Sequence, residues 1–272
     1  MNNIFKYAIA ILLLSLYACD PIENRDEMKG NNMTEAKISA TPVVVDGMNS
    51  NKVILNSEGN KCLSNWNWGT GSSSNSYVEA KLVVKGDQNI TYTGLNPDGT
   101  QFQQVLTVHI ETLLDVSPLW GYLCGTGTKE WTWTGTAWGI GEWQNATSPN
   151  WWGAGSDMMN DHECGLYPYQ GTGATMTFTV AGGKLTIKRS DGKTMEGFFS
   201  IDDTKTLNRP NGNPWSVGQL KTTGVTVLHG GLINDGCAPV YQYEIVVLDD
   251  DKLVLAAQNS AGAGTYWMFA PI

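Results

Sequence analysis

Short stretches in which β-branched and aromatic residues alternate with polar ones recur along most of the chain, separated by Gly, Asn, Asp, Ser and Pro. Helical periodicity is almost absent after residue 18. Stretches of this length and spacing predict antiparallel strands in sandwiches or barrels. Examples are YVEAKLVV, FQQVLTVHIETL, ATMTFTVAGGKLTIK and YEIVVLDDDKLVLAA. The pattern therefore predicts an all-β fold.

Two pairs of predicted strands are close enough in sequence to form hairpins. One pair surrounds Gly182-Gly183 and the other surrounds Asp249-Asp250-Asp251. The aspartate run has two interpretations, a set of calcium ligands or a solvated turn. No further acidic residues flank it at a calcium-ligand spacing, so the turn is favoured.

The segment LLDVSPLWG ends a predicted strand and continues with a proline and a glycine, which favours a domain boundary near residue 115. Residues 39–114 suit a small Ig-like sandwich. Residues 115–272 suit a larger antiparallel sandwich of the jelly-roll kind. The sequence therefore predicts two all-β domains.

Residues 1–18 have the composition of a secretory signal peptide, with Lys6 followed by an apolar run and small residues. The run is too short for a stable membrane span. Its ending LYAC, which closes on Cys19, resembles the lipobox of bacterial lipoproteins. That resemblance implies cleavage before Cys19 and acylation of the cysteine, which gives a stable lipid anchor. The alternative is an ordinary secretory peptide with an incidental cysteine.

Residues 19–38 are polar and acidic and show no hydrophobic periodicity, so they predict a flexible tether. An acidic run directly behind a lipidated cysteine resembles the export signal that carries some Gram-negative lipoproteins to the outside of the cell. The resemblance implies a protein anchored in the outer membrane whose folded part is exposed at the cell surface.

The net charge is −9, and no stretch is rich in Lys and Arg. Nucleic acid is therefore a poor partner, because neutralising phosphates requires clustered cations, and a neutral ligand fits better. The Gly-x-Gly pairs lack the third glycine and the strand-to-helix context of a nucleotide loop, so no cofactor is expected. No two cysteines have C-x-x-C spacing, so no metal site is expected.

Four cysteines remain if Cys19 carries lipid: Cys62, Cys124, Cys164 and Cys237. An exported location permits disulfides, and four cysteines allow three pairings, between which the sequence does not choose. Four buried free thiols are an equal alternative.

The segment LSNWNWGTGSSSNSYVEAKLVVKGDQNITYTGLNPDGTQFQQVLTVHI resembles a degenerate polycystic-kidney-disease (PKD) type domain. Trp66, Gly69, Gly71 and Ser72 match the Trp-Asp-Phe-Gly-Asp-Gly-Ser pattern of that family, whereas Asn67 and Thr70 replace its two aspartates. The resemblance implies a spacer or interaction module between the anchor and the C-terminal domain.

Residues 129–272 resemble the C-terminal region of surface glycan-binding lipoproteins from starch-utilisation-type gene clusters. The stretches KEWTWTGTAWGIGEW, SPNWWGAG, ATMTFTVAGGKLTIK and YEIVVLDDDKLVLAA carry the resemblance, together with the terminal TYWMFAP. A histidine often seen before the Gly-x-Gly loop is replaced by Trp138. The resemblance implies capture of polysaccharide or oligosaccharide and association with an outer-membrane glycan importer.

Catalytic motifs give little support for an enzyme. Glycoside hydrolysis requires a pair of carboxylates, and the strand motif Glu-x-Asp-x-x-Glu does not occur. Near the tryptophans, Glu142, Asp157, Asp161 and Glu163 lie in a segment typical of loops, where polar surface residues are expected. His162-Glu163 lacks the second histidine of a metalloprotease motif. A glycosidase with an unfamiliar carboxylate pair remains one alternative, and a structural or adhesive lipoprotein remains another.

Six of the eleven tryptophans lie between Trp131 and Trp152. An indole ring can be a hydrophobic anchor or a flat platform for a sugar ring. Trp131 and Trp133 share one face of a predicted strand and are expected in the core, as are Trp66 and Trp267. The candidates for carbohydrate binding are Trp138 and Trp143, which flank GIGE in an expected loop, one exposed ring of the adjacent Trp151 and Trp152, and the loop carboxylate of Asp157.

Overall fold

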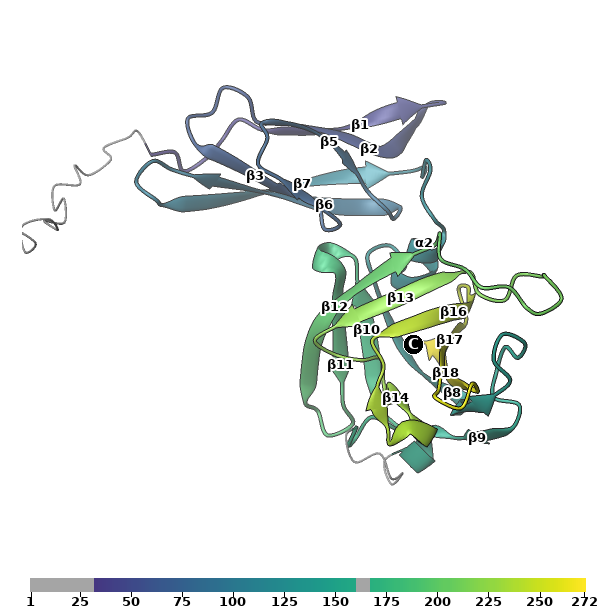
Figure 1. The fold of residues 1–272 in the computed structure, drawn as a ribbon. Coiled ribbons are helices and arrows are strands. Elements are labelled where there is room, and N and C mark those ends of the chain that lie inside the picture. Colours follow the sequence, from purple (N-terminus) through teal and green to yellow (C-terminus); the bar gives the residue numbers. More distant parts are fainter. Residues whose placement is uncertain (1–31, 160–166) are drawn as a thin grey trace, which may run out of the picture.

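A computed structural model of the chain describes residues 32–159 and 167–272, and it confirms the all-β class (Figure 1). The smaller, N-terminal part contains two facing antiparallel sheets. One sheet has the order β1-β2-β5, formed by Ser39–Val45, Met48–Asn56 and Tyr77–Lys81. The other has the order β4-β3-β6-β7, formed by Ser72–Ser73, Leu63–Asn67, Gly86–Leu95 and Gln101–Ile110.

The small domain encloses its own hydrophobic core between these sheets. Trp66 is fully buried there, as the sequence predicts, and its ring meets that of Tyr92 edge-on with 4.8 Å between centroids. Val53 and Leu55 from β2 and Ile90 from β6 complete the centre of this core. Alternate residues of each strand face inward, which is the pattern of a sheet with one buried face.

The segment before β1 is bound to the small domain by side-chain amides. Asn96 accepts a hydrogen bond from the Met33 N–H and donates one to the Met33 carbonyl, both at 2.9 Å. The Ala36 N–H donates to Gln104 Oε1 at 2.7 Å, and Ala36 is buried. The prediction of a flexible tether over residues 19–38 is therefore wrong for residues 33–38. This segment has no hydrophobic pattern, but polar side chains of the small domain hold its backbone. Residues 19–31 lie outside the described residues.

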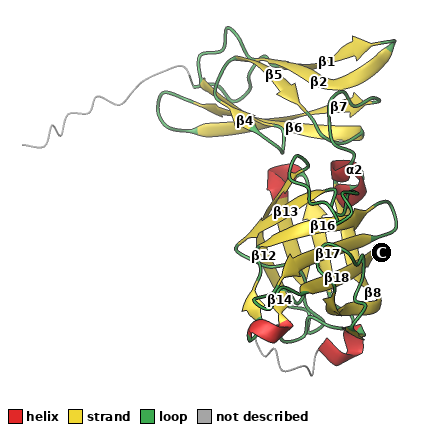
Figure 2. Ribbon diagram, turned by 45° about the vertical axis from the view of Figure 1, so that its right-hand side comes forward, coloured by secondary structure: helices red, strands yellow, loops and turns green. Residues whose placement is uncertain are grey.

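The larger, C-terminal part is one antiparallel sheet that closes on itself. Its strands β8, β10, β11, β12, β13, β16, β17 and β18 pair in that order, and β18 pairs again with β8 (Figure 2). Their bounds are Thr128–Gly141, Thr175–Thr179, Lys184–Lys188, Thr194–Asp202, Gly218–Thr223, Gln242–Leu248, Leu253–Gln258 and Gly264–Pro271. The sequence pattern predicts these strands as part of a sandwich, and the pairing of the first with the last gives a closed eight-stranded barrel.

Short elements complete this domain. A helix, α2 (Leu119–Cys124), precedes β8, and a short strand, β9 (Trp152–Ala154), pairs with its second half. The others are η2 (Ser156–Met159), η3 (Ala181–Gly183), β14 (Gly231–Leu232), η4 (Ile233–Asp235) and β15 (Ala238–Pro239). Both predicted hairpins are present as β10–β11 and β16–β17. In the second hairpin, Asp249 Oδ1 accepts the Asp251 N–H at 2.9 Å, as in a solvated turn.

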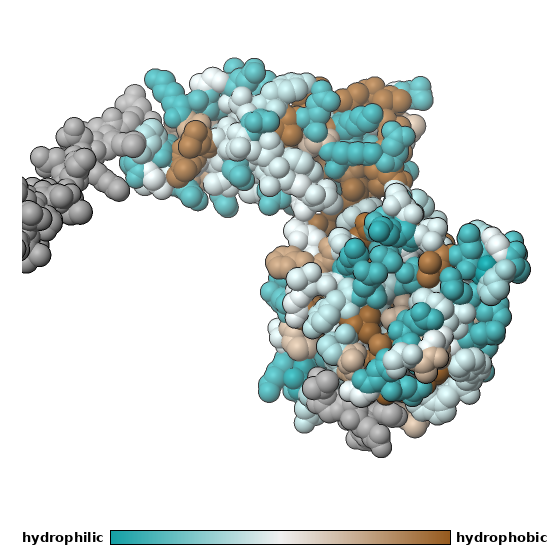
Figure 3. All heavy atoms as spheres, in the orientation of Figure 1, coloured by the Kyte–Doolittle hydropathy of each residue, from teal (hydrophilic) through white to brown (hydrophobic). Residues whose placement is uncertain are grey.

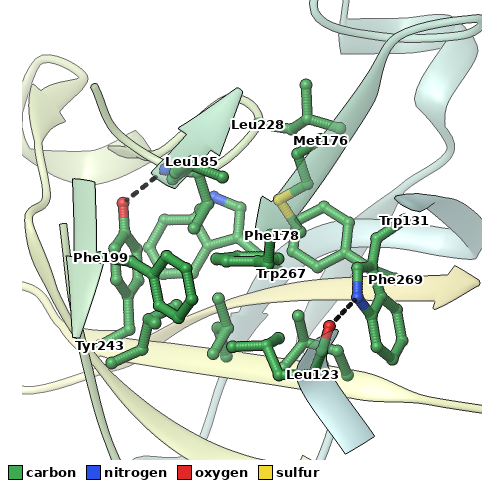
Figure 4. Packing of buried hydrophobic residues seen from close by; sticks show 14 of the residues in the cluster. Leu123, Trp131, Met176, Phe178, Leu185, Phe199, Leu228, Tyr243, Trp267 and Phe269 are labelled. Carbon is green, nitrogen blue, oxygen red and sulfur yellow. Dashed lines mark hydrogen bonds between the residues drawn. The ribbon is translucent and has the colours of Figure 1, made fainter. Parts of the chain in front are cut away.

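Aromatic side chains fill the barrel interior (Figure 4). Trp131 and Trp267 have no exposed surface and Trp133 has 8%, so the prediction that these three rings belong to the core is confirmed. Their indole N–H groups donate to the carbonyls of Leu123, His229 and Gln170 at 2.8–2.9 Å. A buried N–H group needs such a partner, because burial removes its hydrogen bond to water.

The two domains contact each other at the barrel end next to α2, where hydrophobic atoms lie at the junction (Figures 1 and 3). Val84 of the small domain is 1% exposed and belongs to the hydrophobic cluster of the barrel. The Gly182 N–H donates to the Gly69 carbonyl at 3.0 Å, and Gln88 Nε2 donates to the Thr126 carbonyl at 2.8 Å. The buried Asn51 also holds the connecting segment through the Leu114 N–H at 2.8 Å.

The sequence leaves open whether the cysteines form disulfides or remain free thiols, and both states occur. Cys237 is disulfide-bonded, whereas Cys62 and Cys124 are free thiols, so the disulfide alternative is wrong for these two. They lie in different cores, because Cys62 packs in the small domain and Cys124 in the barrel. Burial raises the pKa of the Cys124 thiol to about 12. Cys164, Cys19 and the predicted signal peptide lie outside the described residues.

Replacing Asn96 tests the docking of the N-terminal segment. Asn96→Ala removes both hydrogen bonds to Met33 and a third to Thr100 Oγ1 at 3.0 Å. We expect a loss of about 2 kcal/mol in the free energy of unfolding, measured by urea denaturation. Asn75→Ala, at an exposed position, serves as the control and should change this value by less than about 0.5 kcal/mol. Equal stability of the two variants would contradict the docking.

Candidate functional site

A pocket of about 370 Å³ lies on the outside of the barrel over β16 and β17. One indole, one phenol, two amides and one carboxylate line it, supplied by Trp143, Tyr241, Gln242, Gln258 and Glu244. Apolar residues and Pro239 form the rest of the lining. The pocket lies beside β14 and β15, at the barrel end away from the small domain, where Figure 1 labels β14.

A second, smaller hydrophobic cluster explains why Trp143 lies there. The interior of the barrel is already filled, yet β17 and β18 are apolar on both faces and bury Val254, Tyr266 and Met268 on the outside. Trp215 covers this outer surface, and the ring of Trp143 meets it edge-on with 4.6 Å between centroids. Trp143 is half-buried as a result, with one side packed and another lining the pocket.

Hydrogen bonds fix the loop that carries Trp143. The Tyr266 hydroxyl donates to the Glu142 carbonyl at 2.7 Å, and Trp215 Nε1 donates to the Ala146 carbonyl at 2.6 Å. The Ala146 N–H closes the turn onto the Glu142 carbonyl at 3.0 Å. Burial raises the pKa of Tyr266, so this phenol keeps its proton at neutral pH. The position of Trp143 is thus set before any ligand arrives, which lowers the entropy cost of binding.

Glu244 is the buried carboxylate of the pocket, with 8% of its surface exposed. It lies on β16 between Tyr243 and Ile245, whose side chains point into the barrel, so Glu244 points outward. Ser216 Oγ donates to its Oε2 at 2.9 Å, and Gln219 Nε2 donates to its Oε1 at 2.8 Å. An ionised carboxylate has about four acceptor sites, so each oxygen can accept a further hydrogen bond.

A second pocket, of about 250 Å³, shares Pro239 and Tyr241 with the first. Tyr167, Gln170 and Met195 contribute to its lining. We call the residues that line the two pockets the outer groove. Tyr241, which is 46% exposed, lines both pockets. Burial, and next the neighbouring phenol of Tyr241, raise the pKa of Tyr167 to about 12, so Tyr167 is a neutral hydrogen-bonding group at pH 7.

The prediction that Trp138 offers an exposed platform is wrong, because its ring has no exposed surface. The sequence pattern predicts a loop here, but β8 continues through Gly139 and Gly141 and pairs with β9 and β18. These glycines permit close backbone packing: a Cβ at Gly139 would lie 2.2 Å from the Trp152 carbonyl oxygen. Trp138 instead packs in the core, with its ring 4.6 Å from that of His229.

Trp151 and Trp152 are both exposed, by 62% and 41%. Strand parity predicts one ring inside and one outside. β9 is only three residues long, however, and starts at Trp152, so parity does not constrain Trp151. The Trp152 ring meets the edge of Trp138 with 6.1 Å between centroids. Neither Trp151 nor Trp152 lines the outer groove.

The remaining candidates from the sequence do not converge on the outer groove. Asp157 is exposed in η2, and its side chain is not among the residues that line either pocket. Asp161, His162 and Glu163 lie outside the described residues. Tyr241, Gln242, Glu244 and Gln258 were missed by sequence reasoning. Alternation along YQYEI would have placed Glu244 opposite the inward Tyr243, but it would not have shown that Trp143 lies beside it.

No protein-family model matches this chain, and no curated protein matches it either. No helix within residues 32–159 and 167–272 is long and apolar enough to cross a membrane. Over the same residues, no three His, Cys, Asp or Glu side chains are grouped so that they could hold a metal ion.

The buried phenols predict alkaline sensitivity. Burial holds the pKa of Tyr167 at about 12 and that of Tyr243 well above its ordinary value of 10. The folded protein therefore favours the neutral phenols, and this stability is complete below pH 10 and is lost as the pH rises through 12. We expect the urea midpoint to fall between about pH 10 and about pH 12. Tyr243→Phe should reduce the slope, and a flat profile in the unmodified protein would contradict the burial of these phenols.

Proposed function

We propose that this protein is a cell-surface lipoprotein that binds polysaccharide without cleaving it. The observation that carries the proposal is the composition of the outer groove. Trp143 and Tyr241 line it together with two glutamines and Glu244. Rigid aromatic rings beside amides and a carboxylate are a combination suited to a polyhydroxylated ring.

The aromatic rings supply the apolar part of the binding energy. Each face of a pyranose exposes a patch of C–H bonds, and stacking this patch on an indole or phenol removes apolar surface from water. Burial of about 60–80 Å² corresponds to about 2 kcal/mol before entropy losses. Trp143 is already fixed by Trp215, so little further ordering is needed.

The polar groups supply orientation. Gln242 and Gln258 are exposed side chains with both donors and acceptors, and Glu244 is an acceptor held by Ser216 and Gln219. Hydroxyl groups at the edge of a stacked sugar ring can bond to both kinds of group. Binding residues usually lie on loops that a rigid scaffold positions, and the outer groove on the barrel fits this arrangement.

The same residues favour binding over hydrolysis. A glycosidase requires two carboxylates on opposite sides of the scissile bond. Among the described residues that line the outer groove, Glu244 is the only carboxylic acid. Measuring the release of reducing ends from a bound glycan distinguishes the two activities, and release would overturn the non-catalytic assignment.

The N-terminal sequence supports the location. The lipobox-like LYAC and the acidic residues after Cys19 suit a lipoprotein carried to the outer face of the outer membrane. The resemblance of residues 129–272 to surface glycan-binding lipoproteins supports the same assignment. In this proposal, the PKD-like domain is a spacer and the bound glycan is passed to an outer-membrane importer.

Substitution of the two aromatic residues tests the site. Trp143→Ala and Tyr241→Ala should each weaken the retention of a bound glycan in affinity electrophoresis by about tenfold, because each removes one stacking surface. Tyr77→Ala, at an exposed aromatic residue of the small domain, is the matched control and should have no effect. Thermal unfolding of each variant separates loss of binding from loss of fold. A loss confined to Trp151→Ala or Trp152→Ala would place the site at β9 instead.

Substitution of the lipobox cysteine tests the anchor. Cys19→Ser removes the thiol that would be acylated, so we expect the protein to leave the membrane fraction and become soluble in the extracellular or periplasmic fraction. Cys62→Ser, which changes a free thiol of the small domain, should leave the protein in the membrane fraction. Membrane retention of the Cys19→Ser protein would contradict the lipoprotein assignment.

A further inference from the structure

We propose that the outer groove selects an internal stretch of a neutral polysaccharide, and that Glu244 is the residue that excludes acidic glycans. This inference rests on the proposed function and adds the class of ligand and the residue that determines it. The outer groove has two adjoining open pockets, one carboxylate, and two hydrogen bonds that hold this carboxylate.

The outer groove consists of two pockets with a shared wall. Its two pockets, of about 370 Å³ and 250 Å³, share Pro239 and Tyr241, with Trp143 in one and Tyr167 in the other. Both pockets are open to solvent. A glycan chain that lies across Tyr241 can therefore contact both halves and extend beyond them, whereas recognition of a chain end would require a closed pocket.

The charge of the groove is negative at neutral pH. Among the described residues that line it, Glu244 is the only carboxylic acid, and no Lys, Arg or His is present. A carboxylate or sulfate on the ligand would meet Glu244 without a cation between them. Like charges brought together in a partly desolvated site disfavour the complex. A neutral chain has no such penalty.

The hydrogen bonds of Glu244 favour a ligand that donates. Ser216 and Gln219 each donate to one of its oxygens and so fix the plane of the carboxylate. An ionised carboxylate only accepts hydrogen bonds, so its further partners must be donors, such as sugar hydroxyl groups. A charged acceptor also makes stronger hydrogen bonds than a neutral one.

The test compares neutral polysaccharides with their carboxymethylated derivatives in affinity electrophoresis. A panel of neutral β-glucan, xylan, mannan and starch-type chains identifies those that the unmodified protein retains, and each retained chain is then carboxymethylated. We expect retention to weaken by about tenfold or more after carboxymethylation. Glu244→Gln should reduce this difference to less than about threefold, because the amide keeps the shape without the charge. Glu58→Gln, which removes one charge from the exposed surface of the small domain, should leave the difference unchanged.

The possible outcomes separate this inference from the proposed function. If no polysaccharide is retained, the proposed function fails and the inference fails with it. If neutral and carboxymethylated chains are retained equally, or if a glucosamine polymer is retained more strongly than any neutral chain, the ligand class is wrong while glycan binding stands.

A second variant keeps the test decisive if Glu244→Gln does not fold. Gln242→Glu adds a carboxylate at an exposed position of the same pocket and should weaken binding of carboxymethylated chains further. Internal recognition is tested with oligosaccharides of the retained glycan. Affinity should rise with chain length and should not change when the reducing end is reduced with borohydride. Affinity that depends on the reducing end would overturn recognition of an internal stretch.

Discussion

The pairing of β8 with β10 on one side and with β18 on the other is the interaction on which the C-terminal domain depends. It joins the first and last strands of the barrel and leaves no unpaired edge between them. Closure also creates an interior that large side chains must fill, and Trp131, Trp138 and Trp267 do so. Of the six tryptophans between Trp131 and Trp152, three are therefore structural: Trp131, Trp133 and Trp138.

A filled interior moves the candidate binding chemistry to the outside of the barrel. The outer face of β17 and β18 is apolar as well, and the loops that carry Trp143 and Trp215 cover it. The loops leave part of this face open, and the pocket at that place is lined by both Trp143 and Glu244. One physical requirement, the shielding of an apolar sheet face from water, thus also places an aromatic ring beside a hydrogen-bonded carboxylate.

The small domain is held firmly at the other end of the barrel. Val84 enters the barrel cluster, and the backbone contact between Gly69 and Gly182 brings two turns together. A Cβ at Gly69 would lie 3.2 Å from the Ala181 Cα, and its φ of +91° also favours glycine. The outer groove lies beside β14, which is at the barrel end away from the small domain (Figure 1).

The sequence by itself determined what depends on local periodicity. Alternation predicted the all-β class, the hairpins at Gly182-Gly183 and Asp249–Asp251, and the inward direction of Trp131 and Trp133, because side chains alternate across a strand. Only the tertiary structure decided which strands meet. Four features depend on contacts between distant segments: closure of the barrel, burial of Trp138, the free thiols of Cys62 and Cys124, and the pocket that Trp143 and Glu244 both line. Local patterns do not encode such contacts.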